Sequence, residues 1–123
     1  MNSRAKVLTV GHDPLLLKTR RQLLQMLGET ESTDNPAEAA AAIESYGLAL
    51  VVFCHTLTAD ECRQLSDLAR SRAYPPKILG LCSPKSGERA GVVDCSLSSG
   101  YGPAKLVETA AAMLKRGSQA LNQ

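Results

Sequence analysis

The sequence lacks any apolar run long enough to cross a membrane. Its longest, residues 48–54, falls far short of the roughly 20 residues that span a bilayer as a helix. Residues 1–6 are not followed by the apolar stretch that an export signal requires. Hydrophobic residues make up 44% of the chain and charged residues 21%, which is ordinary for a folded soluble protein. We therefore expect a cytoplasmic protein that does not bind membranes.

The sequence also lacks closely spaced cysteine pairs. Cys54, Cys62, Cys82 and Cys95 contain no CxxC motif, and a chain of 123 residues can build one core without needing disulfides. Reduced thiols are the default expectation. We predict a single domain over residues 1–116 and a frayed tail over residues 117–123.

The sequence also lacks a large excess of charge of either sign. The net charge of +2 is too small to indicate nucleic-acid binding, although Lys18, Arg20 and Arg21 lie close together. A wider basic stripe and a reading helix would be needed for that function. The cluster is more simply a solvated helix face, with a patch for an acidic protein partner as the alternative.

The chain does contain a regular alternation of strand and helix patterns. Short β-rich runs predict strands over residues 5–10, 29–33, 48–53, 77–82 and 92–97. Helices are predicted over residues 15–27, 36–46, 62–72 and 103–116. The run LALVVF is apolar on both faces, as in a central parallel strand covered by helices. The alternation predicts an α/β fold, a doubly wound parallel sheet with helices on both faces.

Two helix starts carry capping signals. Asp13-Pro14 supplies a cap followed by proline at the first helical position, and Thr58 with Glu61 has the spacing of a capping box. Both signals come within a few residues of the end of a predicted strand. In open parallel sheets, ligands and chemistry gather at these carboxyl ends. Here the ends are residues 11–13, 54–55, 82–83 and 98–100.

Two segments carry a resemblance to a known family. KVLTVGHDPLLLKTRRQLLQMLG and LALVVFCHTLTADECRQL resemble the receiver domain (CheY-like) of bacterial two-component response regulators, and the similarity extends over about residues 6–114. It implies a flavodoxin-like fold with five parallel strands in the order 2-1-3-4-5. Residues 82–99 look shorter than the corresponding family segment and have few apolar positions, so we expect the fourth helix to be short or missing.

The residues that perform the family's chemistry are replaced. The family uses a phosphoaccepting aspartate after strand three, an acidic pair that holds Mg²⁺, a Thr or Ser after strand four and a Lys after strand five. The matching positions here are Cys54 for the phosphoacceptor, Gly11 and His12 for the acidic pair with Asp13 beside them, Cys82 for Thr/Ser and Ser99 for Lys. Mg²⁺ prefers oxygen ligands and an acyl phosphate needs a carboxylate. The resemblance thus implies a degenerate pseudo-receiver in two-component (phosphorelay) signal transduction, without enzymatic activity, metal or cofactor.

The expected action of such a domain is phosphorylation-independent contact with a signalling protein, alone or as a homodimer. The alternative is a small α/β ligand-binding or thiol redox module built from His12, Cys54 and Cys82, with His55 as a further metal ligand. Buried cysteines usually behave as small hydrophobic residues, and we favour that interpretation here. The SSGYG run before the last helix lacks a nucleotide-binding motif.

Overall fold

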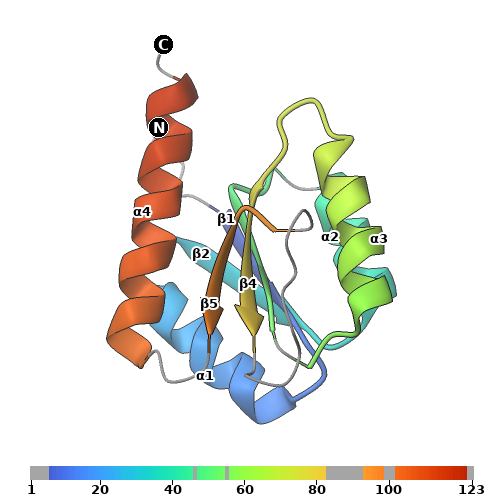
Figure 1. Ribbon diagram of the computed structural model, residues 1–123, viewed down its shortest axis with the longest axis horizontal. Coiled ribbons are helices and arrows are strands. Elements are labelled where there is room, and N and C mark those ends of the chain that lie inside the picture. Colours follow the sequence, from blue (N-terminus) through green and yellow to red (C-terminus); the bar gives the residue numbers. More distant parts are fainter. Residues whose placement is uncertain (1–5, 46, 55, 83–92, 99–101, 122–123) are drawn as a thin grey trace.

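The computed structural model of the protein describes residues 6–45, 47–54, 56–82, 93–98 and 102–121. Within these residues, strands and helices alternate along the chain (Figure 1). The strands are β1 (Lys6–Val10), β2 (Glu29–Thr33), β3 (Leu50–Phe53), β4 (Lys77–Cys82) and β5 (Cys95–Ser98). The helices are α1 (Pro14–Leu24), α2 (Pro36–Ser45), α3 (Ala59–Arg70) and α4 (Pro103–Leu121).

The strands form one parallel sheet in the order β2-β1-β3-β4-β5, which confirms the predicted topology. Helices α1 and α4 cover one face of the sheet, and α2 and α3 cover the other (Figure 1). Because all the strands point the same way, their carboxyl ends lie along one edge. The residues that follow β1 and β3 are therefore neighbours at that edge.

The central strand β3 holds the two apolar layers together. All four of its residues are buried. Val51 and Phe53 pack into the cluster beneath α2 and α3, whereas Leu50 and Val52 pack into the cluster beneath α1 and α4. Successive side chains of a strand point to opposite faces, so a strand covered on both sides must be apolar throughout. This is why LALVVF shows no alternation in the sequence.

The edge strand β2 forms from a sequence with little strand propensity, ETEST. Its full length pairs with β1, from Lys6 opposite Glu29 to Val10 opposite Thr33. Thr30 is buried, whereas its neighbours on either side are exposed. An edge strand has only one pairing neighbour and is partly open to solvent, so polar residues are tolerated along it. Pairing with β1 outweighs the weak local preference.

Several helix ends differ from the prediction. Helix α3 covers Ala59–Arg70 rather than residues 62–72, because it starts directly after its Thr58 cap. The first helix ends at Leu24 rather than at residue 27. Beyond it the hydrogen bonds reach back three residues instead of four, as where the Leu27 N–H donates to the Leu24 carbonyl at 2.9 Å. Helices often end in such tightened turns. The last helix continues to Leu121, so its expected end at residue 116 is wrong. Glycine within a helix costs only about 1 kcal/mol, and alanine and leucine beyond it favour helix.

The fifth strand begins later than predicted, at Cys95 rather than at residue 92. Asp94 accounts for the delay. Its N–H donates to the Ile78 carbonyl at 2.8 Å, while its side-chain Oδ2 accepts from the Ile78 N–H at 2.7 Å. The carboxylate takes a position that a strand carbonyl would otherwise fill, so regular pairing with β4 starts at the following residue. The predicted short or missing fourth helix falls on residues 83–92, which lie outside the described part of the chain.

Candidate functional site at the carboxyl edge of the sheet

The turn after β1 is held by backbone contacts and a helix cap. Gly11 is buried, and its N–H donates to the Thr33 carbonyl at 3.2 Å. Asp13 has an extended backbone, and its Oδ1 accepts from the N–H groups of Leu15 and Leu16 at 3.0 and 3.3 Å. The cap predicted from Asp13-Pro14 is thus confirmed. The carboxylate of Asp13 is engaged with the first turn of α1.

The segment after β3 begins with a buried thiol. Cys54 is 1% exposed and belongs to the apolar cluster beneath α1 and α4. Its N–H donates to the Val10 carbonyl at 2.8 Å, which extends the pairing of β1 and β3 by one residue. Its surroundings are those of a small buried hydrophobic side chain.

Gly11 and Cys54 pack directly against each other. A Cβ atom added at Gly11 would lie 2.7 Å from the Cys54 Cβ, 2.9 Å from the Thr56 Oγ1 and 3.2 Å from the Cys54 Sγ. The first of these separations is closer than side chains tolerate. The space that a side chain after β1 would need is therefore occupied by the residues after β3. A carboxylate at residue 11 could not be introduced without moving this segment.

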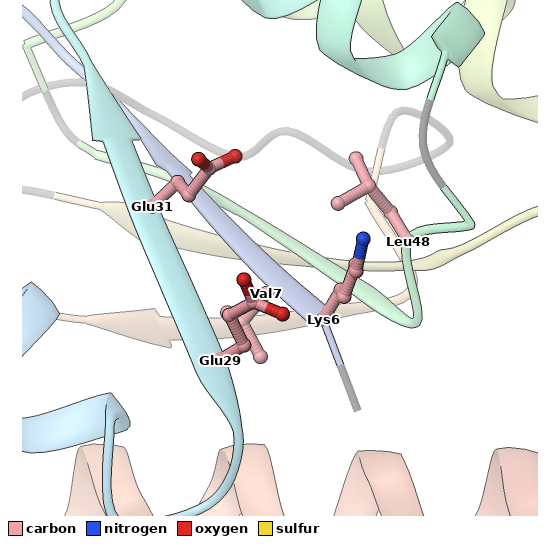
Figure 2. Close-up of a pocket in the computed structure, with 5 residues that line it drawn as sticks. All are labelled: Lys6, Val7, Glu29, Glu31 and Leu48. Carbon is pink, nitrogen blue, oxygen red and sulfur yellow. The ribbon is translucent and has the colours of Figure 1, made fainter. Parts of the chain in front are cut away.

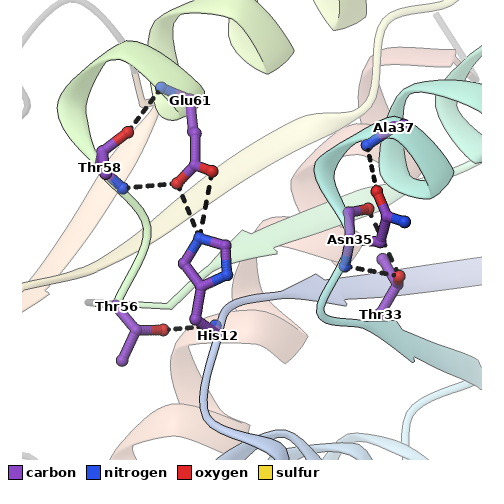
Figure 3. Close-up of polar contacts among 7 residues, drawn as sticks. All are labelled: His12, Thr33, Asn35, Ala37, Thr56, Thr58 and Glu61. Carbon is purple, nitrogen blue, oxygen red and sulfur yellow. Dashed lines mark hydrogen bonds and ion pairs between the residues drawn. The ribbon is translucent and has the colours of Figure 1, made fainter.

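The two loops at this edge are also joined by a polar network (Figure 3). The His12 N–H donates to the Thr56 Oγ1 at 2.7 Å. The His12 Nε2 lies 2.8 Å from Glu61 Oε1 and 3.1 Å from Glu61 Oε2. A carboxylate only accepts hydrogen bonds, so Nε2 carries the proton in this contact. The contact joins the turn after β1 to the first turn of α3.

Glu61 also completes the capping box of α3. Its Oε1 accepts from the Thr58 N–H at 2.9 Å, and its own N–H donates to the Thr58 Oγ1 at 3.1 Å. Burial by itself would raise the pKa of Glu61, but the Thr58 hydrogen bond and the contact with His12 outweigh burial. The pKa of the Glu61 carboxyl therefore lies below its ordinary value of 4.5. This acid is ionised at neutral pH.

The role of Glu61 beyond its cap was not predicted from the sequence. His12 and Glu61 are 49 positions apart, and no motif links them. The only sequence signal is topological, because the turn after the first strand and the helix after the third meet at one sheet edge. That signal places His12 near the start of α3 without selecting a partner for it.

The structure brings only some of the predicted site residues together. Gly11, His12, Asp13 and Cys54 meet at the carboxyl edge, and Cys82 ends β4 at the same edge. The described residues hold no group of three His, Cys, Asp or Glu side chains placed to bind a metal ion. The positions of His55 and Ser99 lie outside the described part of the chain, as does the side chain of Cys82. The thiol pair and the metal site that involve them were alternatives to the favoured interpretation of buried hydrophobic cysteines, and the described residues do not test them.

A pocket lies at the other end of the sheet (Figure 2). It is lined by Lys6, Val7, Glu29, Glu31 and Leu48. Lys6 and Glu29 are the first residues of β1 and β2, so the pocket opens at the amino ends of these strands. The pocket is thus separate from the edge that carries His12 and Cys54.

Comparison with known proteins defines the fold. Neither a scan against protein-family models nor a search of curated proteins gives a match. Solved structures do match, and they show that the chain has the fold of response regulator receiver domains, as the sequence resemblance implied.

Three of these structures illustrate the likeness. A CheY-like receiver domain from Methanospirillum hungatei JF-1 has a TM-score of 0.79 at 21% identity, covering 96% of this chain and 99% of that one. A receiver-modulated diguanylate cyclase from Pelobacter carbinolicus has a TM-score of 0.81 at 17% identity, covering 97% and 99%. A response regulator receiver protein from Sinorhizobium medicae WSM419 has a TM-score of 0.79 at 18% identity, covering 93% and 97%.

The helices were also compared with the requirements for a membrane span. Among the described residues, no helix combines the length and the apolar character needed to cross a bilayer.

Proposed function

We propose that this protein is a pseudo-receiver: a receiver-like signalling domain that acts by contact with a protein partner and accepts no phosphoryl group. The packing of Gly11 against Cys54 carries the proposal. These residues occupy the positions where the resemblance expects a metal-binding acid and the phosphoaccepting aspartate. A Cβ atom at residue 11 would lie 2.7 Å from the Cys54 Cβ. The Cys54 side chain therefore occupies the space that an acidic side chain at residue 11 would need.

The chemistry of the remaining groups supports the same proposal. Phosphoryl transfer to a receiver needs a carboxylate nucleophile and a Mg²⁺ ion that neutralises the developing charge. Cys54 has no carboxylate, Gly11 has no side chain, and His12 is in contact with Glu61. Two carboxylates at this edge, Asp13 and Glu61, both accept helix-capping hydrogen bonds. Neither is available to replace the missing pair without opening a helix terminus.

A protein partner is the proposed target of the domain. The matched structure from Pelobacter carbinolicus is described as a diguanylate cyclase that is modulated by a response regulator receiver. By analogy, we propose that this chain binds a signalling protein in the cytoplasm, as a monomer or a homodimer. No role in nucleic-acid binding is included, because the net charge is only +2, and none in membrane binding, because the longest apolar run covers only residues 48–54.

Reaction with a small phosphodonor tests the proposal. The purified chain is incubated with acetyl phosphate or phosphoramidate, with and without Mg²⁺, and its intact mass is measured. A receiver domain that retains the aspartate and the acidic pair serves as the positive control. We expect no phosphoryl adduct and no Mg²⁺-dependent change in the chain. A stable Mg²⁺-dependent adduct on any aspartate would overturn the proposal.

A matched variant separates the two losses. Cys54→Asp restores the nucleophile but not the metal-binding acids, because Gly11 and His12 remain. We expect this variant to stay unmodified under the same conditions, since Mg²⁺ still lacks its carboxylate ligands. Efficient phosphorylation of Cys54→Asp would mean that the edge still binds the metal, and that only the acceptor has been lost.

A further inference from the structure

We propose that His12 and Glu61 form a latch between the turn after β1 and the first turn of α3, and that protonation of the imidazole tightens it. The latch is internal to the domain and does not depend on whether the domain accepts a phosphoryl group. It gives this edge of the sheet a response to pH, set by its own side chains.

The geometry supports a specific contact rather than a passing one. The His12 Nε2 lies within hydrogen-bond distance of both Glu61 oxygens, at 2.8 and 3.1 Å. The backbone of the same histidine is fixed separately, because its N–H donates to the Thr56 Oγ1 at 2.7 Å. With the backbone fixed in this way, the imidazole reaches Glu61 from a defined position (Figure 3). The two contacts together hold the loops at two points.

Glu61 transmits the contact to the helix. Its Oε1 accepts both from His12 and from the Thr58 N–H at 2.9 Å, which is the hydrogen bond that closes the capping box of α3. A change of charge on the imidazole therefore acts on the same oxygen that caps the helix. The first turn of α3 is the element that responds.

Other acidic residues follow the strands at this edge. Among the described residues they are Asp13 after β1, Asp34 and Glu38 after β2, and Asp60 on α3, and Glu38 accepts from the Thr33 Oγ1 at 2.8 Å. Asp13 caps α1, and Asp60 contacts Arg63 at 3.1 Å. Asp34 is an exposed residue after β2. Within the described residues, Glu61 is the acid seen in contact with His12.

The latch is less exposed than the other ion pair on the same helix turn. The side chains of His12 and Glu61 are 41% and 24% exposed, against 62% and 82% for Arg63 and Asp60. Solvent and salt screen the second pair more strongly. The two pairs differ in a second way, because histidine changes charge between about pH 8 and pH 5 whereas arginine does not. Asp60 thus offers a matched control.

The sign of the pH effect follows from the two partners. A neutral imidazole with its proton on Nε2 already donates a hydrogen bond to Glu61, and protonation adds a positive charge next to the carboxylate. Since the pKa of Glu61 is lowered, its carboxylate persists throughout the range in which histidine takes up a proton. The latch is therefore strongest in mildly acidic solution, above the range in which Glu61 itself is protonated.

A double-mutant cycle tests the latch. The wild type, His12→Gln, Glu61→Gln and the double variant are unfolded in urea at about pH 5.5 and about pH 8, on either side of the ordinary histidine titration. Glutamine at residue 61 still accepts the capping hydrogen bond, so the substitution removes charge and keeps the cap. The control cycle replaces Glu61→Gln by Asp60→Asn, which removes one negative charge from the same helix turn.

We expect the coupling between His12 and Glu61 to change the unfolding equilibrium constant by about two- to five-fold at the lower pH, and by less at the higher pH. The Asp60→Asn cycle should show a coupling factor near one at both. A coupling that is absent, or that is the same at the two pH values, would overturn the proposal. Equal coupling in the control cycle would also overturn it, because the effect would then belong to the general charge of the helix terminus.

Discussion

Phe53 and Cys54 are consecutive residues of one buried segment, yet they belong to two parts of the molecule with different requirements. Phe53 lies inside the sheet, where every strand neighbour and helix contact demands an apolar side chain. Cys54 begins the carboxyl edge, where the receiver fold is expected to carry its chemistry. The fold is shared with solved structures that are 13–21% identical over nearly the whole chain. We expect changes at this edge to leave the strand order intact, because the two apolar clusters, one of which includes Cys54, extend over both faces of the sheet.

The largest expected effect is in the interior. Phe53→Ala removes a fully buried aromatic ring and should lower the free energy of unfolding by about 3–5 kcal/mol. Cys54→Ala, one residue along, removes only a sulfur atom and should cost about 1 kcal/mol. Urea unfolding followed by circular dichroism measures both values. Comparable losses for the two variants would contradict the division between interior and edge, since the edge would then stabilise the fold as strongly as the core.

The next largest effect concerns the close packing of Gly11 against Cys54 at the carboxyl edge. Gly11→Ala places a methyl group 2.7 Å from the Cys54 Cβ and should lower the free energy of unfolding by about 1–3 kcal/mol. The same urea experiment measures the loss. Gly102→Ala is the matched control, because an added Cβ there meets no atom within 4 Å.

A Gly11→Ala variant as stable as the wild type would show that the segment after β3 yields easily. In that case the edge has room for a side chain after β1. The proposal that Gly11 and Cys54 fill the former acidic site would then lose its support.

Most of the fold could be predicted from the sequence, for identifiable reasons. The two-sided apolar run of β3 and the capping signals of Asp13 and Thr58 are local patterns with one structural meaning each. Element ends were less accurate. The start of β5 depends on the Asp94 carboxylate bonding to Ile78 of β4, and no local pattern reveals such a contact between distant residues.

The candidate site was predicted only in part. The sequence resemblance selected Gly11, His12 and Cys54 by position, and the structure places them together at the expected edge. It did not reveal that the Cys54 and Thr56 side chains occupy the space beside Gly11, because this close approach depends on the relative position of β1 and β3. The sequence also did not predict the contact between His12 and Glu61, because the capping box already accounts for a glutamate at residue 61.

The smallest expected effect is the acid dependence of Glu61, which tests whether this edge contributes to stability through charge. The folded pKa of Glu61 is lowered, so its contribution is complete above the ordinary value of 4.5 and is lost as the pH falls through the folded value. Near pH 6 the free energy of unfolding of the wild type should exceed that of Glu61→Gln by less than about 1 kcal/mol, because the His12–Glu61 pair is partly exposed to solvent.

The same comparison near pH 3 distinguishes charge from shape. Protonated glutamic acid and glutamine both accept the capping bond from the Thr58 N–H, so the two proteins should then unfold at nearly the same urea concentration. Asp60→Asn, whose side chain is 82% exposed, should differ less from the wild type at either pH. A difference for Glu61→Gln that persists in acid would mean that glutamate fits the cap better than glutamine. The edge would then contribute to stability by packing, as the interior does, and not by its ion pair.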